Sequence, residues 1–402
     1  MEKRNLRETR ETAASSRNEI EVSAVMPCLN EEETLGICIE KAMSAMNAAG
    51  IQGEVVVSDN GSTDRSVEVA KSLGARVVHQ PLKGYGYALR KGFEETRGQY
   101  IIMGDSDDSY DWTEIPRFVE KLREGNELVM GTRLKGKIEP GAMPWLHRYV
   151  GNPVLSWVLR FLFGSKISDA HCGLRAFSKN AVQRMDLRTG GMELASEIAI
   201  KAAMLGLKTS ELPITLHPDG RSRPPHLNTL RDGWRHLRFM LLFSPDYLFL
   251  WPGFILLFLG IVLFILLLPG PLWIGQVRFD VHSLVLGMLM VVLGTQVIAL
   301  GLFAKVFSYA ERFASRNTFL VRMGRRLSME APLIVGLLVA LAGFIGDLIV
   351  FINWAKTGFG FFQQMRLAIL GSTLLIVGVQ IVFSGIFLSM LGVSRDTYIG
   401  DR

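Results

Sequence analysis

The run Tyr100-Ile101-Ile102-Met103-Gly104-Asp105-Ser106-Asp107 decides the predicted fold of the first half of this chain. Its first four residues form a short apolar segment typical of a buried strand, and acidic residues follow at once. Residues i and i+2 of an extended segment point the same way, so Asp105 and Asp107 are suited to share Mg²⁺ or Mn²⁺. A solvated loop is the alternative, but the position directly after a buried strand favours the metal site.

Short β-branched runs alternate with helical patterns around this segment. We expect strands at residues 21–26, 54–58, 76–79 and 100–103, and helices at 31–49, 64–73 and 85–96. The alternation predicts an α/β domain whose parallel sheet carries helices on both faces. Such sheets bind ligands at the carboxyl ends of their strands. The polar clusters that follow the strands are therefore expected to converge on one edge.

Three further polar clusters follow this rule. They are Pro27-Cys28-Leu29-Asn30-Glu31, Asp59-Asn60-Gly61-Ser62-Thr63-Asp64 and Lys83-Gly84-Tyr85-Gly86. Structural roles are open for each, since Asn60-Gly61 is a strong turn signal and Asn30 is suited to cap the helix that begins at residue 31. The glycine loop at 83–86 has neither dinucleotide-binding nor Walker spacing, which excludes those classes.

The density of charged residues falls sharply after residue 245. The chain of 402 residues has 44 Lys and Arg and 38 Asp and Glu; 33 and 31 of these lie in residues 1–245, which leaves 11 and 7 for the rest. The drop predicts a soluble domain followed by a membrane domain. Four apolar stretches exceed the roughly 20 residues that span a bilayer. They are residues 247–268, 281–304, 332–354 and 367–392.

The loops between these stretches predict their orientation. The connection 305–331 holds Lys305 and five arginines, whereas 269–280 holds only Arg278. The positive-inside rule puts the basic connection in the cytoplasm, and an even number of crossings puts the large N-terminal domain and the C-terminus there too. An odd count of three scattered cysteines agrees with a reduced compartment. We therefore expect a multi-pass integral membrane protein with a cytoplasmic catalytic domain.

Four segments complete the predicted organisation. Residues 1–19 are a polar, flexible tail without a secretory signal, and 20–227 are the α/β domain. Residues 228–245 form a basic, Trp-bearing amphipathic helix suited to the headgroup layer, with a plain connector as the alternative. Residues 246–402 are the membrane domain. Within it, Asp347 is expected to pair with Gln296 or Gln380, in either a functional or a structural role.

Taken in order, the polar clusters resemble glycosyltransferase family 2, whose GT-A fold is Rossmann-like with a mostly parallel sheet. Gly131-Thr132-Arg133 belongs to the same pattern. The later stretches 169–177, Asp-Ala-His-Cys-Gly-Leu-Arg-Ala-Phe, and Gly220-Arg221-Ser222-Arg223 are similar to polyprenyl-phosphate glycosyltransferases of the dolichol-phosphate mannose synthase type. The resemblance covers about residues 20–245, and the four-crossing tail fits members that carry membrane helices.

The resemblance implies roles for individual residues. The nucleotide-sugar would be held by Pro27, Leu29, Glu31, Val57, Asp59, Lys83, Asp105, Ser106 and Asp107, with Asp105 and Asp107 as metal ligands. The acceptor phosphate would be held by Arg133, Arg148, His217, Arg221 and Arg223, and Asp107 and Arg133 would be the catalytic residues. Three positions depart from the family pattern. Ser109 replaces a glutamine, His217 an arginine and Arg223 a lysine.

The predicted reaction moves a hexose, with inversion, from a nucleoside-diphosphate sugar of the GDP-mannose or UDP-glucose type to dolichyl or undecaprenyl phosphate at the cytoplasmic face. A phosphate monoester is largely dianionic at neutral pH, so it attacks without a general base. One alternative is a lipid hydroxyl or polysaccharide acceptor, for which Glu193, Glu197 or Asp169 would have to be the base. Another is a nucleotide-sensing membrane scaffold without catalysis.

The sequence gives further indications about partners. Residues 1–245 carry nearly balanced charge, which gives no support to nucleic-acid binding. The expected partners are the nucleotide-sugar, the polyprenyl phosphate and the membrane itself, and a homo-oligomer is compatible with the four crossings.

Overall fold

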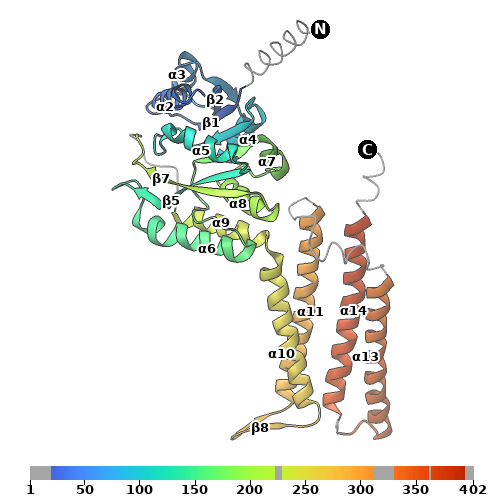
Figure 1. The fold of residues 1–402 in the computed structure, drawn as a ribbon. Coiled ribbons are helices and arrows are strands. Elements are labelled where there is room, and N and C mark those ends of the chain that lie inside the picture. Colours follow the sequence, from blue (N-terminus) through green and yellow to red (C-terminus); the bar gives the residue numbers. More distant parts are fainter. Residues whose placement is uncertain (1–19, 222–228, 311–329, 362–363, 394–402) are drawn as a thin grey trace. The chain divides into compact units, whose positions relative to one another are not determined.

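The computed structural model describes residues 20–221, 229–310, 330–361 and 364–393. The chain divides between Met240 and Leu241 into two compact units, each of which is described by itself (Figure 1). The first unit is an α/β domain, and the second has four helices that are long and apolar enough to cross a membrane. The predicted fold class is confirmed.

A seven-stranded sheet in the order β3-β2-β1-β4-β6-β5-β7 forms the centre of the first unit. The strands are β1 Val22–Cys28, β2 Gly53–Asp59, β3 Arg76–His79, β4 Tyr100–Met103, β5 Leu128–Ile138, β6 Arg175–Ser178 and β7 Thr209–Leu216. Only β6, which lies between β4 and β5, runs antiparallel to its neighbours. The sheet is thus mostly parallel, as predicted.

The described helices of the first unit cover this sheet (Figure 1). They are α2 Leu35–Ala48, α3 Ser66–Ser72, α4 Tyr85–Glu94, α5 Ile115–Arg123, α6 Asn152–Phe163, α7 Lys179–Met185, α8 Leu194–Met204 and α9 Thr229–Leu242, with the short turns η2 Trp112–Glu114 and η3 His147–Gly151. The role of Asn30 as a helix cap is wrong. Asn30 has a φ of 59°, and its Oδ1 accepts a hydrogen bond from the Thr63 amide at 2.7 Å. The helix begins at Leu35, and its N-cap position is Thr34.

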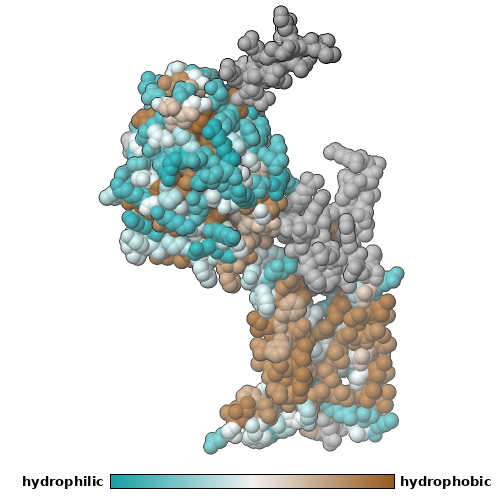
Figure 2. Space-filling view, viewed as in Figure 1, coloured by the Kyte–Doolittle hydropathy of each residue, from teal (hydrophilic) through white to brown (hydrophobic). Residues whose placement is uncertain are grey.

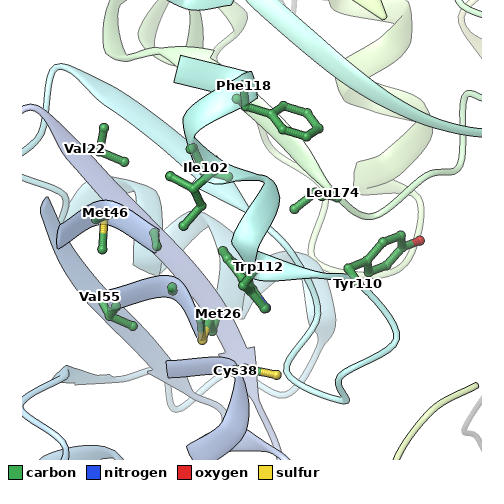
Figure 3. Packing of buried hydrophobic residues seen from close by; sticks show 14 of the residues in the cluster. Val22, Met26, Cys38, Met46, Val55, Ile102, Tyr110, Trp112, Phe118 and Leu174 are labelled. Carbon is green, nitrogen blue, oxygen red and sulfur yellow. The ribbon is translucent and has the colours of Figure 1, made fainter. Parts of the chain in front are cut away.

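Apolar side chains from the sheet and from the helices on one face pack into a continuous core (Figure 3). Met26 in β1 and Ile102 in β4 lie beside Trp112 and Phe118, and all four are almost fully buried. The three cysteines are buried and free, and burial raises the pKa of Cys38 to about 12. This core fixes the strand ends that carry the polar clusters.

The second unit contains η4 Asp246–Leu250, α10 Trp251–Leu267, α11 Val281–Ala310, α13 Glu330–Lys356 and α14 Met365–Val393. The candidate membrane spans run over Asp246–Leu267, Val281–Ser308, Glu330–Lys356 and Met365–Leu391. Their outer surfaces are almost continuously hydrophobic (Figure 2). The connection between the first two spans, predicted from the sequence to be a loop, holds a small hairpin of β8 Leu272–Ile274 and β9 Val277–Phe279.

The helices of this unit pack as two hairpins with the same glycine pattern. In both hairpins, glycines at seven-residue spacing let backbones approach closely. The first set is Gly253 and Gly260 in α10 with Gly287 and Gly294 in α11, and the second is Gly336 and Gly343 in α13 with Gly371 and Gly378 in α14. A Cβ added at Gly260 would lie 2.8 Å from the Gly287 carbonyl, and one at Gly336 would lie 2.8 Å from the Gly378 carbonyl. The two hairpins therefore use equivalent contacts.

This packing decides the partner of Asp347. Its Oδ2 accepts a hydrogen bond from the Ser372 hydroxyl at 3.2 Å, because the glycine contact between α13 and α14 puts residue 372 beside it. The expected pairing of Asp347 with Gln296 or Gln380 is therefore wrong.

Candidate active site

Strands β1, β2 and β4 end at the same edge of the sheet, so the clusters that follow them lie side by side. Cys28 at the end of β1 is in register with Asp59 at the end of β2. The Ser106 hydroxyl after β4 donates to the Pro27 carbonyl at 2.7 Å, and the Thr34 hydroxyl donates to the Ser106 carbonyl at 2.7 Å. The structure thus brings together the polar clusters that the sequence puts after these strands.

Asp107 is oriented by the loop that follows it. Its Oδ1 accepts hydrogen bonds from the Ser109 amide at 3.1 Å and from the Ser109 hydroxyl at 2.6 Å. Its Oδ2 lies 3.0 Å from Nη2 of Arg221. Ser109, a departure from the family pattern, therefore holds the carboxylate in place.

The side chain of Asp105 is held from helix α4. The Tyr85 hydroxyl donates to its Oδ1 at 2.8 Å, which links α4 to the end of β4. Burial, together with the negative charge of Asp107, raises the pKa of Asp105 to about 6. A bound cation would offset both effects, because it stabilises the ionised form of each carboxylate.

The backbone at residue 173 approaches Asp105 closely because this residue is glycine. A Cβ at Gly173 would lie 2.8 Å from Oδ2 of Asp105 and 2.8 Å from the Tyr110 ring. The described residues contain no group of three or more His, Cys, Asp or Glu that would hold a metal alone. Mg²⁺ commonly takes one or two carboxylates and fills its shell with substrate phosphates and water. The residues present therefore fit a cation that arrives with a diphosphate.

Asp59 forms a second fixed carboxylate at this edge. Its Oδ1 accepts from the Ser62 amide at 3.0 Å, and its Oδ2 accepts from the Gly61 amide at 3.2 Å and lies 3.1 Å from Nδ1 of His79. Burial raises the pKa of Asp59, but the hydrogen bonds from Ser62 and its neighbours outweigh burial and hold the pKa below its ordinary value. Asp59 is thus an oriented anion, suited to accept hydrogen bonds from a ligand hydroxyl.

Other residues expected to bind the donor lie around the same edge. Nζ of Lys83 donates to the Asn60 carbonyl at 2.8 Å, which joins the loop before α4 to the turn after β2. Val57 is buried within β2, and Leu29 is half-buried directly after β1. Glu31 is buried and forms an ion pair with Arg221 at 3.0 Å.

Arg133 is held by a buried partner. Its Nε and Nη2 each donate to an oxygen of Asp169 at 2.8 Å, and its own amide donates to Asp169 at 3.0 Å. The Asp169 side chain is completely buried, and that of Arg133 is 10% exposed. Burial raises the pKa of Asp169, but the charge of Arg133 outweighs it and lowers the pKa below its ordinary value. Arg133 and Asp169 therefore form a buried ion pair in which each side chain fixes the other.

The remaining residues expected at the acceptor phosphate lie in different places. Arg148 is in η3, with its guanidinium 5.3 Å from the centre of the Tyr149 ring. His217 follows β7, and its Nδ1 lies 3.1 Å from a carboxylate oxygen of Glu139. Arg223 lies outside the described residues. Of the four described members of this set, Arg221 is the one with a contact to Asp107.

The candidate general bases for an alcohol acceptor also form ion pairs with neighbouring side chains. Glu197 is fully buried, accepts from the Thr189 amide at 2.9 Å and from the Thr189 hydroxyl at 2.6 Å, and pairs with Lys201 at 2.7 Å. Glu193 pairs with Arg235 at 2.8 Å. Together with Asp169, these carboxylates stabilise the loops around the site.

The first unit also has exposed aromatic side chains on η3, α6 and α9. Trp157 and Phe161 on α6 are 56% and 55% exposed and stack at 5.5 Å, while Trp145 and Tyr149 pack together just before this helix. Trp234 on α9 is 58% exposed. Exposed tryptophan and tyrosine are typical of surfaces that meet a bilayer interface.

Three residues of the site gained a role only from the structure. Tyr85 binds Asp105, the Gly173 backbone approaches Asp105 closely, and the Tyr110 hydroxyl accepts from the Gly173 amide at 2.8 Å. Tyr85 and Gly173 lie within the sequence motifs given above, but those motifs did not predict which groups the two residues contact. Tyr110 follows the aspartate loop and carries no motif of its own.

The fold, the paired aspartates at the sheet edge and the four apolar helices define a membrane glycosyltransferase. The family model for glycosyl transferase family 2 matches residues 23–186, and the model for the glycosyltransferase family 2 C-terminal transmembrane region matches residues 302–392. The low-salt glycan biosynthesis hexosyltransferase Agl6 of Haloferax volcanii is 40% identical over 373 residues, which cover 92% of this chain and 89% of that protein. The chain belongs to glycosyltransferase family 2.

Two other similarities cover about half of the chain each. A dolichyl-phosphate hexose transferase of the same organism is 30% identical over 194 residues, covering 48% of this chain and 82% of that protein. The solved structure of glucosyl-3-phosphoglycerate synthase from Mycobacterium tuberculosis, in complex with Mn²⁺, UDP and glucosyl-3-phosphoglycerate, is 25% identical with a TM-score of 0.45. It covers 57% of this chain and 81% of that one.

Proposed function

We propose that this protein transfers a hexose from a nucleoside-diphosphate sugar to a polyprenyl phosphate at the cytoplasmic face of a membrane. The donor is of the GDP-mannose or UDP-glucose type, and the acceptor is dolichyl or undecaprenyl phosphate. The names of two similar proteins, a hexosyltransferase and a dolichyl-phosphate hexose transferase, support the sugar class and the acceptor class. The basic connection at 305–331 supports the cytoplasmic side.

One observation carries the choice of a phosphate acceptor. The three carboxylates suited to act as a base toward an alcohol are Asp169, Glu193 and Glu197, and each is paired with a cationic side chain. A general base must lie within hydrogen-bonding reach of the acceptor hydroxyl, whereas each of these carboxylates is oriented toward its cationic partner. A phosphate acceptor needs no such base. The alcohol acceptor remains the second candidate and predicts a different product in the test below.

The chemistry then depends on charge. An oxygen of the acceptor phosphate attacks the anomeric carbon of the hexose as the bond to the donor diphosphate breaks, and the electron pair leaves with the nucleoside diphosphate. Asp105 and Asp107 would hold Mg²⁺ or Mn²⁺, which stabilises the charge on the departing diphosphate. Asp59 and Lys83 would orient the nucleotide, and attack from the opposite side inverts the anomeric centre.

The membrane gives access to the acceptor. A long isoprenoid stays in the bilayer, so its phosphate is presented at the headgroup layer. The aromatic surface of η3, α6 and α9 would lie in this layer, since Trp and Tyr partition there and the exposed Arg231 and Arg238 of α9 would meet anionic lipid. The four apolar helices would anchor the enzyme.

The proposal is tested with the purified full-length protein in detergent or lipid discs. The protein is incubated with Mg²⁺ or Mn²⁺, a panel of sugar nucleotides, and either a short polyprenyl phosphate or the matching polyprenol, and the products are identified by mass. We expect a hexosyl ester of the phosphate. Product from polyprenol alone would favour the alcohol acceptor. No product with any donor would support the nucleotide-sensing scaffold instead.

A further inference from the structure

Arg221 makes contacts that join two loops of the site. Its Nη2 lies 3.0 Å from Oε1 of Glu31 and 3.0 Å from Oδ2 of Asp107, and its Nε donates to Oε2 of Glu31 at 3.0 Å. The Arg221 side chain is 16% exposed. The positive charge of Arg221 is therefore shared by two negative charges, that of Glu31 after β1 and that of Asp107 after β4.

The backbone holds Arg221 in this position. The His217 amide donates to the Ser109 carbonyl at 3.0 Å, and the Gly220 amide donates to the Asp107 carbonyl at 3.0 Å. The segment after β7 thus runs along the aspartate loop. A Cβ at Gly220 would lie 3.0 Å from a methyl group of Thr34, so a side chain there would push this segment away.

The two oxygens of Asp107 are used differently. Ser109 holds Oδ1 through two hydrogen bonds, whereas Oδ2 is the oxygen that contacts Arg221. A divalent cation bound to Oδ2 at about 2.0–2.1 Å would lie close to the guanidinium and repel it. Arg221 and the metal therefore compete for one oxygen.

We propose that Arg221 is an exchangeable counter-ion of Asp107. It neutralises the carboxylate before the donor arrives, leaves when a divalent cation binds with the donor, and is then free to bind a substrate phosphate. This inference rests on the proposed function and adds an order of binding to it. Phosphate recognition by Arg221 becomes available only after the metal is in place, so binding of metal and binding of phosphate are coupled.

The first experiment measures metal alone. Mn²⁺ binding to the full-length protein without nucleotide is followed by electron paramagnetic resonance for the wild type, Arg221→Ala, Arg221→Gln and Arg65→Ala. Arg65 is the matched control, because it is an arginine after β2 that pairs with Glu32 at 3.5 Å and is mostly exposed. Arg221→Gln removes the charge but keeps hydrogen-bonding capacity, and a melting temperature checks the folding of each variant.

We expect both Arg221 variants to bind Mn²⁺ at least about fivefold more tightly than the wild type, the lower end of typical coupling between sites. Arg65→Ala changes only the net charge and should have a much smaller effect. Unchanged or weaker Mn²⁺ binding in Arg221→Gln, or an equal gain in Arg65→Ala, would overturn the exchange.

The second experiment tests which substrate phosphate Arg221 binds after a metal ion has displaced it from Asp107. Binding of a short polyprenyl phosphate and of a nucleoside diphosphate is measured by calorimetry with and without saturating Mn²⁺. In the wild type, Mn²⁺ should strengthen phosphate binding at least about fivefold, and Arg221→Gln should lose part of this gain. A loss confined to the lipid phosphate assigns Arg221 to the acceptor, and a loss confined to the nucleotide assigns it to the donor. If Arg221→Gln keeps the full gain for both, Arg221 does not bind phosphate.

These results separate the inference from the proposed function. Tighter Mn²⁺ binding in the Arg221 variants, together with a wild type that forms no hexosyl polyprenyl phosphate, would uphold the exchange and reject the acceptor. If the wild type forms the product but the Arg221 variants bind Mn²⁺ no more tightly than the wild type, the proposed function is upheld and the exchange is rejected.

Discussion

Arg133 and Asp169 form a two-pronged ion pair, in which Nε and Nη2 of the guanidinium each lie 2.8 Å from one carboxylate oxygen. The pair joins β5 to the loop before β6, and the Asp169 side chain is completely buried. Such a pair is costly to break, because the partner left behind is a buried charge. It binds the loop that carries Gly173 to the sheet, beside Asp105.

Arg133→Ala should therefore act mainly on stability. We expect a loss of about 3–5 kcal/mol in the free energy of unfolding, seen as a lower melting temperature in detergent. Arg133→Lys should recover only part of it, since an ammonium group does not reproduce the fork of the guanidinium. An unchanged melting temperature with selectively weaker use of lipid phosphate would instead support the acceptor role expected from the sequence.

Asp107→Asn should lower hexose transfer by at least about 10²-fold, the usual loss when a group that stabilises transition-state charge is removed. The rate is measured with saturating metal, and folding is checked by the melting temperature. Asp108→Asn is the matched control. Asp108 pairs with Lys41 at 2.7 Å and has a φ of 59°, which asparagine tolerates, so activity should be retained. Equal loss in both variants would contradict the metal assignment.

Gly173→Ala should weaken binding of metal and donor. The new methyl group would lie 2.8 Å from Oδ2 of Asp105 and displace it, and overpacking of this kind costs about 1–3 kcal/mol. Where this cost falls on binding, the affinity drops by about 5- to 150-fold. Calorimetry with Mn²⁺ and a nucleoside diphosphate measures the effect. Gly36→Ala in α2 is the control, because a Cβ there meets only ordinary contacts at 3.4 and 3.6 Å. Unaltered affinity in Gly173→Ala would show that the ligand does not depend on the position of Asp105.

Glu54 predicts a pH dependence of stability. Burial raises its pKa, but hydrogen bonds from Ser23, the Arg97 amide and Arg76 outweigh burial and hold the pKa below its ordinary value. A lowered folded-state pKa contributes stability above the ordinary pKa, and this is lost as the pH falls through the folded-state value. Glu54→Gln should lower the melting temperature at pH 7, and the difference from the wild type should shrink as the pH falls below the ordinary glutamate pKa of 4.5. A constant difference would contradict the assignment.

The glycine contacts of the membrane unit predict unequal effects of the same substitution. A Cβ at Gly378 would overlap the backbone of Ala340, whereas one at Gly346 would meet only the Cα of Gly371 at 3.6 Å. Gly378→Ala should therefore lower the thermal stability in detergent, by about 1–3 kcal/mol, and Gly346→Ala should not. Similar melting temperatures for the two variants would argue against the close approach of α13 and α14.

The sequence was sufficient for features set by local patterns. Hydrophobic periodicity predicted the alternating strands and helices, with Tyr100–Met103 and Arg76–His79 matching their strands residue for residue, and composition predicted the four apolar helices. The chain order of the polar clusters predicted that they meet at one edge, because parallel strands carry their carboxyl ends to the same side.

Contacts between distant segments were decided only by the tertiary structure. The family resemblance implied a phosphate role for Arg133 but could not predict its contact with Asp169 at 2.8 Å. It also could not predict that Arg221 lies between Glu31 and Asp107. The reason is physical: a side chain's type fixes which partners it is able to bind, whereas the packing of strands and loops far apart in the chain fixes which partner lies within hydrogen-bonding distance.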